Sequence, residues 1–141
     1  DFSFLPRDQG RPVANRVEGG KRPLSAMAPT LVFDGKGELA LALGSAGGSA
    51  IITDVAKTVL AVIDWRMDLG RAMALPNIGN RNGPTDLEAR PDTASLAAAL
   101  AARGHVIRLN QRASGLAGIA VTPRGLEAAA DPRREGAGAG D

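Results

Sequence analysis

The chain has no cysteine and one histidine, His105, among its 141 residues. The missing cysteine excludes disulfides, thiolate nucleophiles and cysteine-based metal sites, and it fits either redox compartment. One histidine cannot build a metal site of several histidines. Tyrosine is also absent, and the aromatic residues are three Phe and one Trp. The core must therefore come from Ala, Val, Leu and Ile.

The chain also lacks long apolar runs and a strong charge of one sign. No apolar run reaches the ~20 residues that a membrane-spanning helix needs, and no signal peptide is present. The 17 basic and 15 acidic residues give a net charge of +2. The basic residues between Arg7 and Arg22 are scattered, whereas nucleic-acid-binding proteins cluster them, often beside stacking aromatics. We predict no membrane span and no nucleic-acid partner.

A hairpin is predicted where the apolar pattern first becomes regular. Residues 29–33 and 38–43 are typical of strands, and Asp34–Gly37 is a turn sequence whose glycines can adopt positive φ. Both faces of the second strand are apolar, so we expect it to be covered on both sides. The preceding residues 5–23 are rich in glycine and proline and indicate an extended, irregular loop.

Helices and further strands follow the hairpin. Ser49 is predicted to cap a helix that runs to about residue 65, and Asp68 to cap a shorter one that ends near Leu75, before Pro76. A mostly antiparallel sheet with helices packed on it, an α+β fold, is the economical architecture. The remaining expected segments are turns over 76–85, a helix over 94–103 ended by Gly104, strands over 105–109, 118–122 and 126–130, and a fraying tail over 136–141.

The most chemically informative segment is Gly44–Ser49, which holds Gly47 and Gly48 between a buried strand and a helix. Without Cβ atoms, the backbone there can approach a ligand and direct N–H groups toward it. A helix N-terminus adds partial positive charge. The spacing alone leaves two interpretations open: a tight strand-to-helix turn, or a cradle for a phosphate, a carboxylate or a developing oxyanion.

Several polar residues have plain structural interpretations as well. Ser25 fits an ordinary turn, and it does not lie in a Gly-x-Ser-x-Gly elbow. A serine–histidine triad within the chain is rejected, because the one histidine has no nearby partner. Asp131 fits a turn before Pro132, and His105 fits the start of a strand. Asp1 fits a frayed end.

Three segments together resemble the small subunit of the γ-glutamyltranspeptidases (glutathione hydrolases), in its C-terminal part. They are Gly20–Thr30 with its Pro-Leu-Ser turn, the paired-glycine loop Gly44–Ser49, and Ala130–Gly136 with its Asp-Pro-Arg sequence. The resemblance covers nearly the whole chain. It implies an αββα sandwich of the N-terminal nucleophile hydrolase type, of which this chain supplies the C-terminal portion. Within it we expect an active-site loop region over 1–28, sheet and helices over 29–135, and a flexible tail over 136–141.

The resemblance also implies roles for individual residues. Gly47 and Gly48 match the paired glycines that form the family's oxyanion hole. Ser25 matches a serine that binds the α-carboxylate of the glutamyl substrate, whereas Ala26 stands where the family commonly has a second serine. Asp1, in Asp1-Phe2-Ser3, matches the aspartate that pairs with the substrate's α-amino group. The substitution at Ala26 predicts a weaker carboxylate contact or relaxed donor specificity.

The family's nucleophile is a threonine that becomes N-terminal when the precursor cleaves itself. No threonine of this chain has the matching setting, and its first residues look internal, so we expect the chain to be inactive alone. The implied partners are the upstream segment and large subunit of the same precursor and a γ-glutamyl substrate such as glutathione, with no metal or cofactor, in the periplasm or secreted. Two alternatives remain: a related amide acylase, such as a cephalosporin acylase, and a catalytically inactive binding partner.

Overall fold

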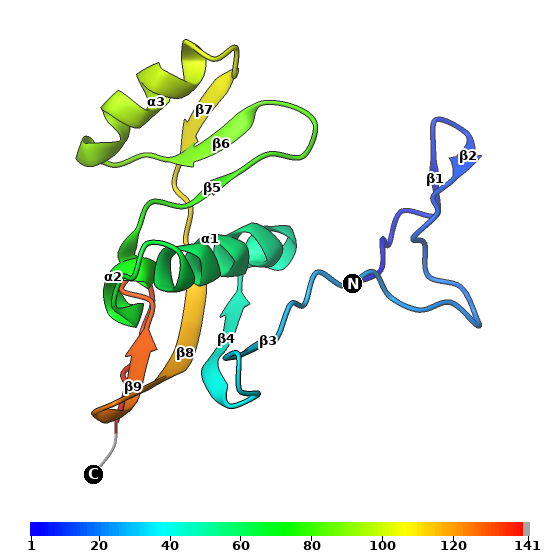
Figure 1. The fold of residues 1–141 in the computed structure, drawn as a ribbon. Coiled ribbons are helices and arrows are strands. Elements are labelled where there is room, and N and C mark those ends of the chain that lie inside the picture. The colour runs from blue at the N-terminus through cyan, green and yellow to red at the C-terminus, as the bar shows by residue number, and fades with distance from the viewer. Residues whose placement is uncertain (140–141) are drawn as a thin grey trace.

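The computed structural model describes residues 1–139 of the chain. Its central feature is a four-stranded antiparallel sheet in the order β3-β4-β8-β9 (Figure 1). The strands are β3 (Thr30–Phe33), β4 (Leu39–Ala46), β8 (Gly115–Thr122) and β9 (Gly125–Ala130). The predicted strands over 29–33, 38–43, 118–122 and 126–130 are therefore confirmed, although β4 and β8 are longer than expected.

The turn between β3 and β4 forms as its sequence predicts. Asp34 Oδ1 accepts hydrogen bonds from the Lys36 and Glu38 amides at 2.8 and 2.9 Å. Gly37 adopts a φ of 84°, which favours glycine. These contacts fix the register in which Val32 pairs with Leu41.

Two helices, α1 (Ile51–Ile63) and α2 (Leu69–Ala74), cover one face of the sheet. The buried core joins Leu41 and Leu43 of β4 to Val55 of α1, Met73 of α2 and Leu116 of β8. Asp68 caps α2 by accepting a hydrogen bond from the Arg71 amide at 2.8 Å, as predicted. The layer positions the N-terminus of α1 beside the end of β4.

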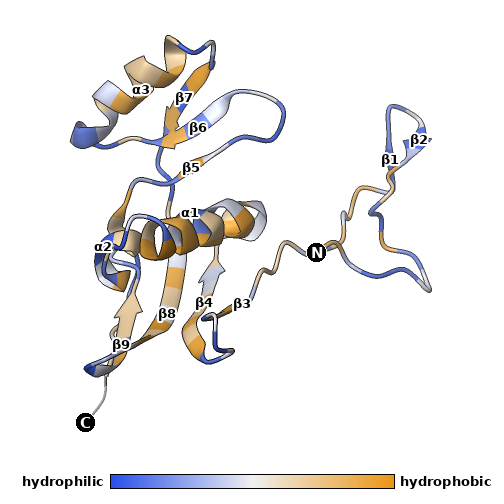
Figure 2. Cartoon of the chain, in the orientation of Figure 1, coloured by the Kyte–Doolittle hydropathy of each residue, from blue (hydrophilic) through white to orange (hydrophobic). Residues whose placement is uncertain are grey.

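The opposite face of the sheet is apolar and, apart from the tail residues beside β9, exposed among the described residues. Strand pairing places Leu31 beside Ala42, Ala42 beside Ile119, and Val121 beside Leu126. Leu31 is 61% exposed and Leu126 72% exposed, and Figure 2 shows apolar residues along β8 and β9. We call this surface the open face. The described chain thus covers one of the two faces of β4 that were expected to be buried.

A second, smaller sheet has the order β5-β6-β7. It contains β5 (Ile78–Gly79), β6 (Thr85–Glu88) and β7 (Ile107–Asn110), and β6 runs parallel to β7. The connection between β6 and β7 is a short 3₁₀ helix followed by α3 (Ala94–Ala101), and Gly104 follows with a φ of 88°. The expected helix over 94–103 is confirmed, whereas the turns expected over 76–85 also contain β5 and the first residue of β6.

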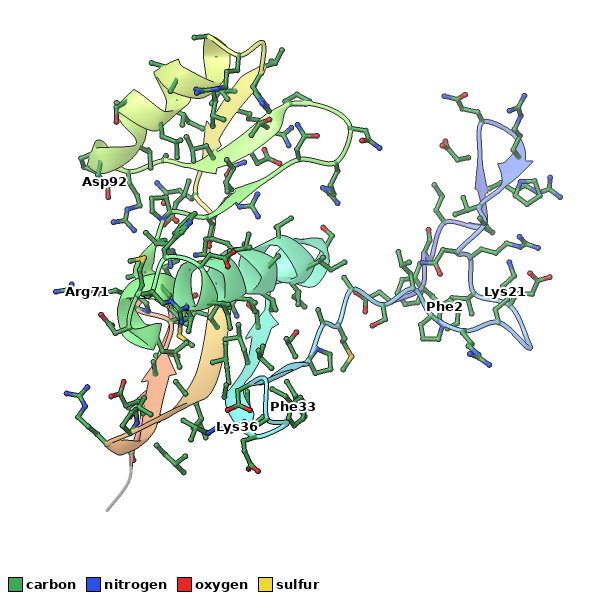
Figure 3. The ribbon with its side chains drawn as sticks, in the orientation of Figure 1. Phe2, Lys21, Phe33, Lys36, Arg71 and Asp92 are labelled. Carbon is green, nitrogen blue, oxygen red and sulfur yellow. The ribbon has the colours of Figure 1, made fainter. Side chains whose placement is uncertain are left out.

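Residues 1–27 form a separate lobe, which we call the N-terminal lobe (Figure 1), and Ala28 already packs against the core. It carries the two-residue strands β1 (Arg7–Asp8) and β2 (Arg11–Pro12) and is otherwise irregular, as expected. Figure 3 shows Phe2 and Lys21 in this lobe, well away from Phe33 and Lys36 at the β3–β4 turn. Phe4 is 93% exposed and Met27 77% exposed, so the lobe presents apolar side chains with no cover from the described chain.

The first residues of the C-terminal tail lie against β9. A Cβ at Gly136 would come within 3.1 Å of the Ala130 Cβ, and one at Gly138 within 2.7 Å of the Ala128 carbonyl oxygen. Glycine is therefore needed at residue 138 for this close approach. Residues 140–141 of the expected tail lie outside the described residues.

We predict that Leu41→Ala lowers the free energy of unfolding by about 2–5 kcal/mol, because it removes a fully buried side chain from the core. The matched control is Leu60→Ala on α1, where the side chain is 50% exposed, and a much smaller loss is expected. Urea denaturation of the two variants measures the difference. Equal losses would contradict this assignment of the core.

Candidate active site

The paired glycines adopt backbone conformations that other residues rarely take. Gly47 has a φ of 148° and Gly48 a φ of 58°. They join the end of β4 to a short 3₁₀ helix, Gly48–Ala50, which leads directly into α1. A Cβ at Gly48 would meet nothing within 4 Å, so conformation rather than space requires glycine there.

The amides of both glycines are available to a ligand. Within residues 1–139, no backbone hydrogen bond engages the N–H group of Gly47 or Gly48. Their carbonyls are used instead: Ala50 donates to Gly47 at 3.3 Å, and Ile51 donates to Gly48. Two free N–H groups at the start of a 13-residue helix can stabilise negative charge.

Ser49 does not cap α1, so that prediction is wrong. The N-cap residue is Ala50, with no side-chain capping bond. The Ser49 hydroxyl instead accepts a hydrogen bond from Arg81 Nη1 at 2.8 Å. The intervening 3₁₀ turn moves the helix start beyond the serine, which leaves Ser49 to anchor the loop that follows β5.

A polar cavity of about 350 Å³ lies beside the glycine loop. It is bounded by the start of α1, by the loop after β5 and by the segment after β7. Asp54 Oδ2 lies 3.7 Å from the position that a Cβ of Gly47 would occupy, so the cavity and the glycine loop are adjacent. The lining residues are Ser49, Ala50, Thr53, Asp54, Gly79, Asn80, Arg81, Asp86, Asn110, Gln111, Arg112, Ala113 and Ser114.

Asp54 and Arg112 provide opposite charges in this cavity. Asp54 is only 2% exposed, and burial raises the pKa of its carboxyl against the opposing charge of Arg112. Arg112 Nη2 lies 3.5 Å from Asp54 Oδ1, an ion pair longer than a hydrogen bond. Asp54 lies between Ile51 and Val55 on the buried side of α1. A carboxylate within the apolar stripe of a helix is unusual, and this pattern could have identified Asp54 from the sequence.

The other predicted site residues lie in the N-terminal lobe. The Asp1 carbonyl accepts hydrogen bonds from the Leu24 amide at 3.0 Å and from Asn15 Nδ2 at 2.8 Å, and the Asp1 backbone nitrogen donates to the Leu24 carbonyl. Ser25 follows at once, and its hydroxyl accepts from the Met27 amide at 3.2 Å, with Ala26 between them. The structure therefore brings Asp1 to the turn that carries Ser25 and Ala26.

The lobe and the glycine loop remain two separate groups in the described residues. No hydrogen bond within residues 1–139 joins the Asp1–Ser25 pair to Gly47 or Gly48. The two groups are linked through the chain by β3 and β4, because β3 follows the lobe and β4 ends at the glycines.

A buried network of hydrogen-bonded polar side chains holds Ser114, one of the residues that line the cavity. Asn77 donates through Nδ2 to Ser114 Oγ at 2.8 Å and accepts from Lys57 Nζ at 2.9 Å. Ser114 donates to Asp131, which also accepts from the Arg133 amide at 3.0 Å. The Asp131 turn is therefore formed as the sequence indicates, and it serves packing.

Lys57 was missed by sequence reasoning, although a lysine within the apolar stripe of α1 is unusual. It is 9% exposed and donates to the Leu75 carbonyl at 2.9 Å. Burial, and then the nearby charge of Arg133, lower the pKa of Lys57 from 10.5 to about 8.

His105 has a structural contact, in line with its predicted role. Its Nδ1 lies 2.9 Å from the Thr85 hydroxyl, just before β7. Across residues 1–139, no group of three or more His, Asp or Glu side chains is arranged to hold a metal ion.

Comparison with known proteins gives a consistent result. The family model described as Gamma-glutamyltranspeptidase matches residues 1–141. The Glutathione hydrolase proenzyme of Escherichia coli (strain K12) is 38% identical over 125 residues, which cover 85% of this chain and 21% of that protein. The Acylase ACY 1 proenzyme of Pseudomonas sp. (strain V22) is 39% identical over 138 residues, which cover 96% of this chain and 24% of that protein. The chain thus spans 21–24% of the length of these curated relatives.

Solved structures agree. The structure described as Gamma-glutamyltranspeptidase from Pseudomonas nitroreducens complexed with L-DON superposes with a TM-score of 0.79 at 31% identity, covering 92% of this chain and 69% of that one. The Bacillus anthracis transpeptidase enzyme CapD superposes with a TM-score of 0.69 at 17% identity, which speaks for the fold alone.

We predict that the free energy of unfolding rises between pH 8 and pH 10.5 because of Lys57. Below pH 8 the Lys57 amine is protonated in both the folded and the unfolded state. Between pH 8 and pH 10.5 it is neutral in the folded state but still protonated in the unfolded state. Because the unfolded state then binds more protons, the free energy of unfolding increases with pH. The full gain is about 3 kcal/mol. Denaturation across this window measures it, and Lys57→Met should flatten the slope. The chain has no tyrosine or cysteine to titrate there; an unchanged slope in Lys57→Met would overturn the assignment.

Proposed function

Because the chain belongs to the γ-glutamyltranspeptidase family, we propose that the protein containing it transfers or hydrolyses the γ-glutamyl group of glutathione and related γ-glutamyl amides. The family's solved structures have the fold expected from the sequence, that of the N-terminal nucleophile hydrolases. In that αββα sandwich, this chain supplies the sheet β3-β4-β8-β9 and the helix layer α1–α2.

The observation that carries the proposal is the free pair of amides at Gly47 and Gly48. Attack on an amide carbonyl produces a tetrahedral intermediate with a negatively charged oxygen. Hydrogen-bond donors already directed at that oxygen lower the barrier, because they need no reorganisation during the reaction. Positive φ at both glycines and the helix that follows them provide two such donors with partial positive charge.

The N-terminal lobe supplies contacts for the glutamyl group in this proposal. Asp1 would bind the α-amino group through a charge-assisted hydrogen bond, and Ser25 would donate to the α-carboxylate. Hydrogen bonds hold the Asp1 backbone to Leu24, so both side chains come from one small unit. Ala26 adds no hydroxyl, so the α-carboxylate has one fewer side-chain donor than in most of the family.

The nucleophile comes from outside these residues in this proposal. The threonine hydroxyls of the chain are tied to local groups: Thr53 donates to the Ala50 carbonyl, and Thr58, which is fully buried, donates to the Asp54 carbonyl. A threonine exposed by self-cleavage of a precursor would attack, with its own α-amine as the base. The relatives named as proenzymes support this arrangement.

The partner proposed for this chain is the rest of the same precursor. The open face carries Leu31, Ile119, Val121 and Leu126, each at least 43% exposed, and apolar surface of this kind is stabilised by burial. A second sheet packed there would complete the sandwich. The exposed Phe4 and Met27 of the lobe provide further apolar surface.

No helix among residues 1–139 has the length and apolar character to cross a membrane. We propose a periplasmic or secreted location from the family.

A related amide acylase is the second candidate. Ala26 favours it, because loss of a hydroxyl at the carboxylate contact relaxes the demand for a glutamyl donor. The similarity to the Acylase ACY 1 proenzymes supports it as well. The two candidates differ in whether the enzyme needs the α-amino group of the donor.

We predict that Gly48→Ala in the full precursor lowers kcat for γ-glutamyl-p-nitroanilide about 10²–10³-fold, because a Cβ disfavours the positive φ that places the two amides. Gly37→Ala is the matched control, since Gly37 also has a positive φ of 84° but lies in the β3–β4 turn. It should lose stability without a comparable loss of kcat. Equal effects of the two substitutions on kcat would count against an oxyanion role.

We predict that the enzyme prefers γ-glutamyl-p-nitroanilide over glutaryl-p-nitroanilide, which lacks the α-amino group, by about 10-fold or more in kcat/KM. Asp1→Asn should abolish the preference, because it removes the charge that pairs with the ammonium. Asp8→Asn, an exposed aspartate of β1, should retain it. Indifference of the wild-type enzyme to the α-amino group would favour the acylase.

A further inference from the structure

The loop between β5 and β6 carries the one Asn-Gly pair of the sequence, Asn82-Gly83. This loop projects from the second sheet on the side where α1 begins (Figure 1), and residues 81–84 are exposed. Asn82 has a φ of 60°, which asparagine adopts more readily than most residues. Asparagine is a chemically labile residue, so an exposed Asn-Gly pair calls for a closer look at its reacting groups.

The two groups that react in asparagine deamidation are both free here. Within residues 1–139, neither the Asn82 side-chain amide nor the Gly83 backbone N–H has a hydrogen-bond partner. Asn80 holds the flanking groups instead. Its Oδ1 accepts from the Asn82 backbone amide at 2.8 Å, and its Nδ2 donates to the Gly83 carbonyl at 2.8 Å. The loop is therefore held around the pair, while the nucleophile and the electrophile stay unpaired.

The surroundings of Gly83 favour the reaction in two ways. A Cβ built at Gly83 would meet nothing within 4 Å, and without one the nitrogen of Gly83 can approach the Asn82 Cγ. Gly83 also lines a small cavity with Arg81, Asp86 and Arg108. Two guanidinium groups and one carboxylate leave a net positive charge there, which stabilises the negative charge that forms when the amide nitrogen loses its proton.

The other four asparagines of the chain are protected by comparison. None of them precedes a glycine. Each uses its side-chain amide in a hydrogen bond: Asn15 to Asp1, Asn77 to Ser114, Asn80 to Gly83 and Asn110 to Asp86. They are therefore internal controls for the reactivity of Asn82.

We propose that Asn82 is a site of spontaneous deamidation, and that the carboxylate formed there withdraws Arg81 from Ser49. The Gly83 nitrogen forms a bond to the Asn82 Cγ, the bond from Cγ to Nδ2 breaks, and ammonia leaves with the proton of the Gly83 amide. Water, the one co-reactant, then opens the cyclic imide. Its addition at the γ-carbonyl carbon gives aspartate, and its addition at the α-carbonyl carbon gives isoaspartate.

Arg81 connects this loop to the paired glycines. Its Nη1 donates to Ser49 Oγ at 2.8 Å, and Ser49 follows the paired glycines directly. A carboxylate at residue 82 is a stronger acceptor for a guanidinium than a hydroxyl is, because both partners are then charged. Asp86 leaves Arg81 available, since that carboxylate is already bound by Arg108 Nε at 2.5 Å and Nη2 at 2.9 Å. Deamidation thus removes an anchor of the glycine loop, and its effect on catalysis rests on the proposed function.

Peptide mass spectrometry of the mature enzyme, prepared from the full precursor and aged in mildly alkaline buffer, tests the modification. The tryptic peptide that begins at Asn82 should gain the mass of an amide-to-acid exchange, whereas the peptide that carries Asn77 and Asn80 should not. Gly83→Ala should slow the gain about 10-fold or more, because a Cβ hinders the approach of the nitrogen. It should fold normally, since Gly83 has no positive φ and a Cβ fits there. Absence of the gain in the wild type would overturn the site.

Hydrolysis of γ-glutamyl-p-nitroanilide tests the consequence. Asn82→Asp should lower kcat about 3-fold to 10-fold with little change in KM, because the glycine loop loses one hydrogen bond. Asn82→Gly, which accepts the φ of 60° and adds no charge, is the matched control and should retain the wild-type kcat. In an Arg81→Ala background, Asn82→Asp should have no further effect, because both changes act through the same hydrogen bond.

The outcomes separate the two proposals. Wild-type kcat in Asn82→Asp, or additive losses in the double variant, would overturn the link between residue 82 and the glycine loop. Asn82→Asp keeps a side chain of the same shape at an exposed position, so folding should be preserved. Failure of the wild type to release p-nitroaniline would overturn the proposed function, while mass spectrometry would still decide whether Asn82 deamidates.

Discussion

The guanidinium of Arg133 joins parts of the chain that are distant in sequence, and the site depends on their arrangement. It donates to both carboxylate oxygens of Glu88 on β6, at 2.8 and 2.7 Å, and to the Met73 and Leu75 carbonyls at the end of α2, at 2.9 and 2.7 Å. Burial alone raises the pKa of Glu88, but hydrogen bonds from Arg133 and the Asn77 amide hold it below its usual value. Breaking such a buried pair leaves an uncompensated charge, so the second sheet is held firmly against α2.

This connection explains how a cavity can form between elements that are distant in the sequence. The start of α1, the loop after β5 and the segment after β7 meet only if the second sheet is fixed relative to the first. Asn77 and Ser114 extend the network toward the cavity, because Asn77 Nδ2 also donates to the Arg112 carbonyl at 3.3 Å. The Arg112 side chain is thereby placed opposite Asp54.

Local patterns predicted much of the fold, and long-range contacts account for what they missed. The alternation of Leu and Ala predicted β4, the helical spacing of apolar residues predicted α1, and Asp68 predicted the N-cap of α2. The strand Thr85–Glu88 carries two acidic residues in four and has no apolar period; it forms because Leu87 is buried and Glu88 is paired with Arg133. At the site, the resemblance to the family identified Gly47 and Gly48. No local pattern predicts that Arg112 contacts Asp54, because the two residues lie 58 positions apart in the sequence (112 − 54).

The charges near Gly47 also constrain any oxyanion chemistry. A lone carboxylate beside an oxyanion would oppose it, because like charges repel strongly where water is excluded. Asp54 therefore suits this position only with a compensating cation, and Arg112 is the group that provides one, at 3.5 Å.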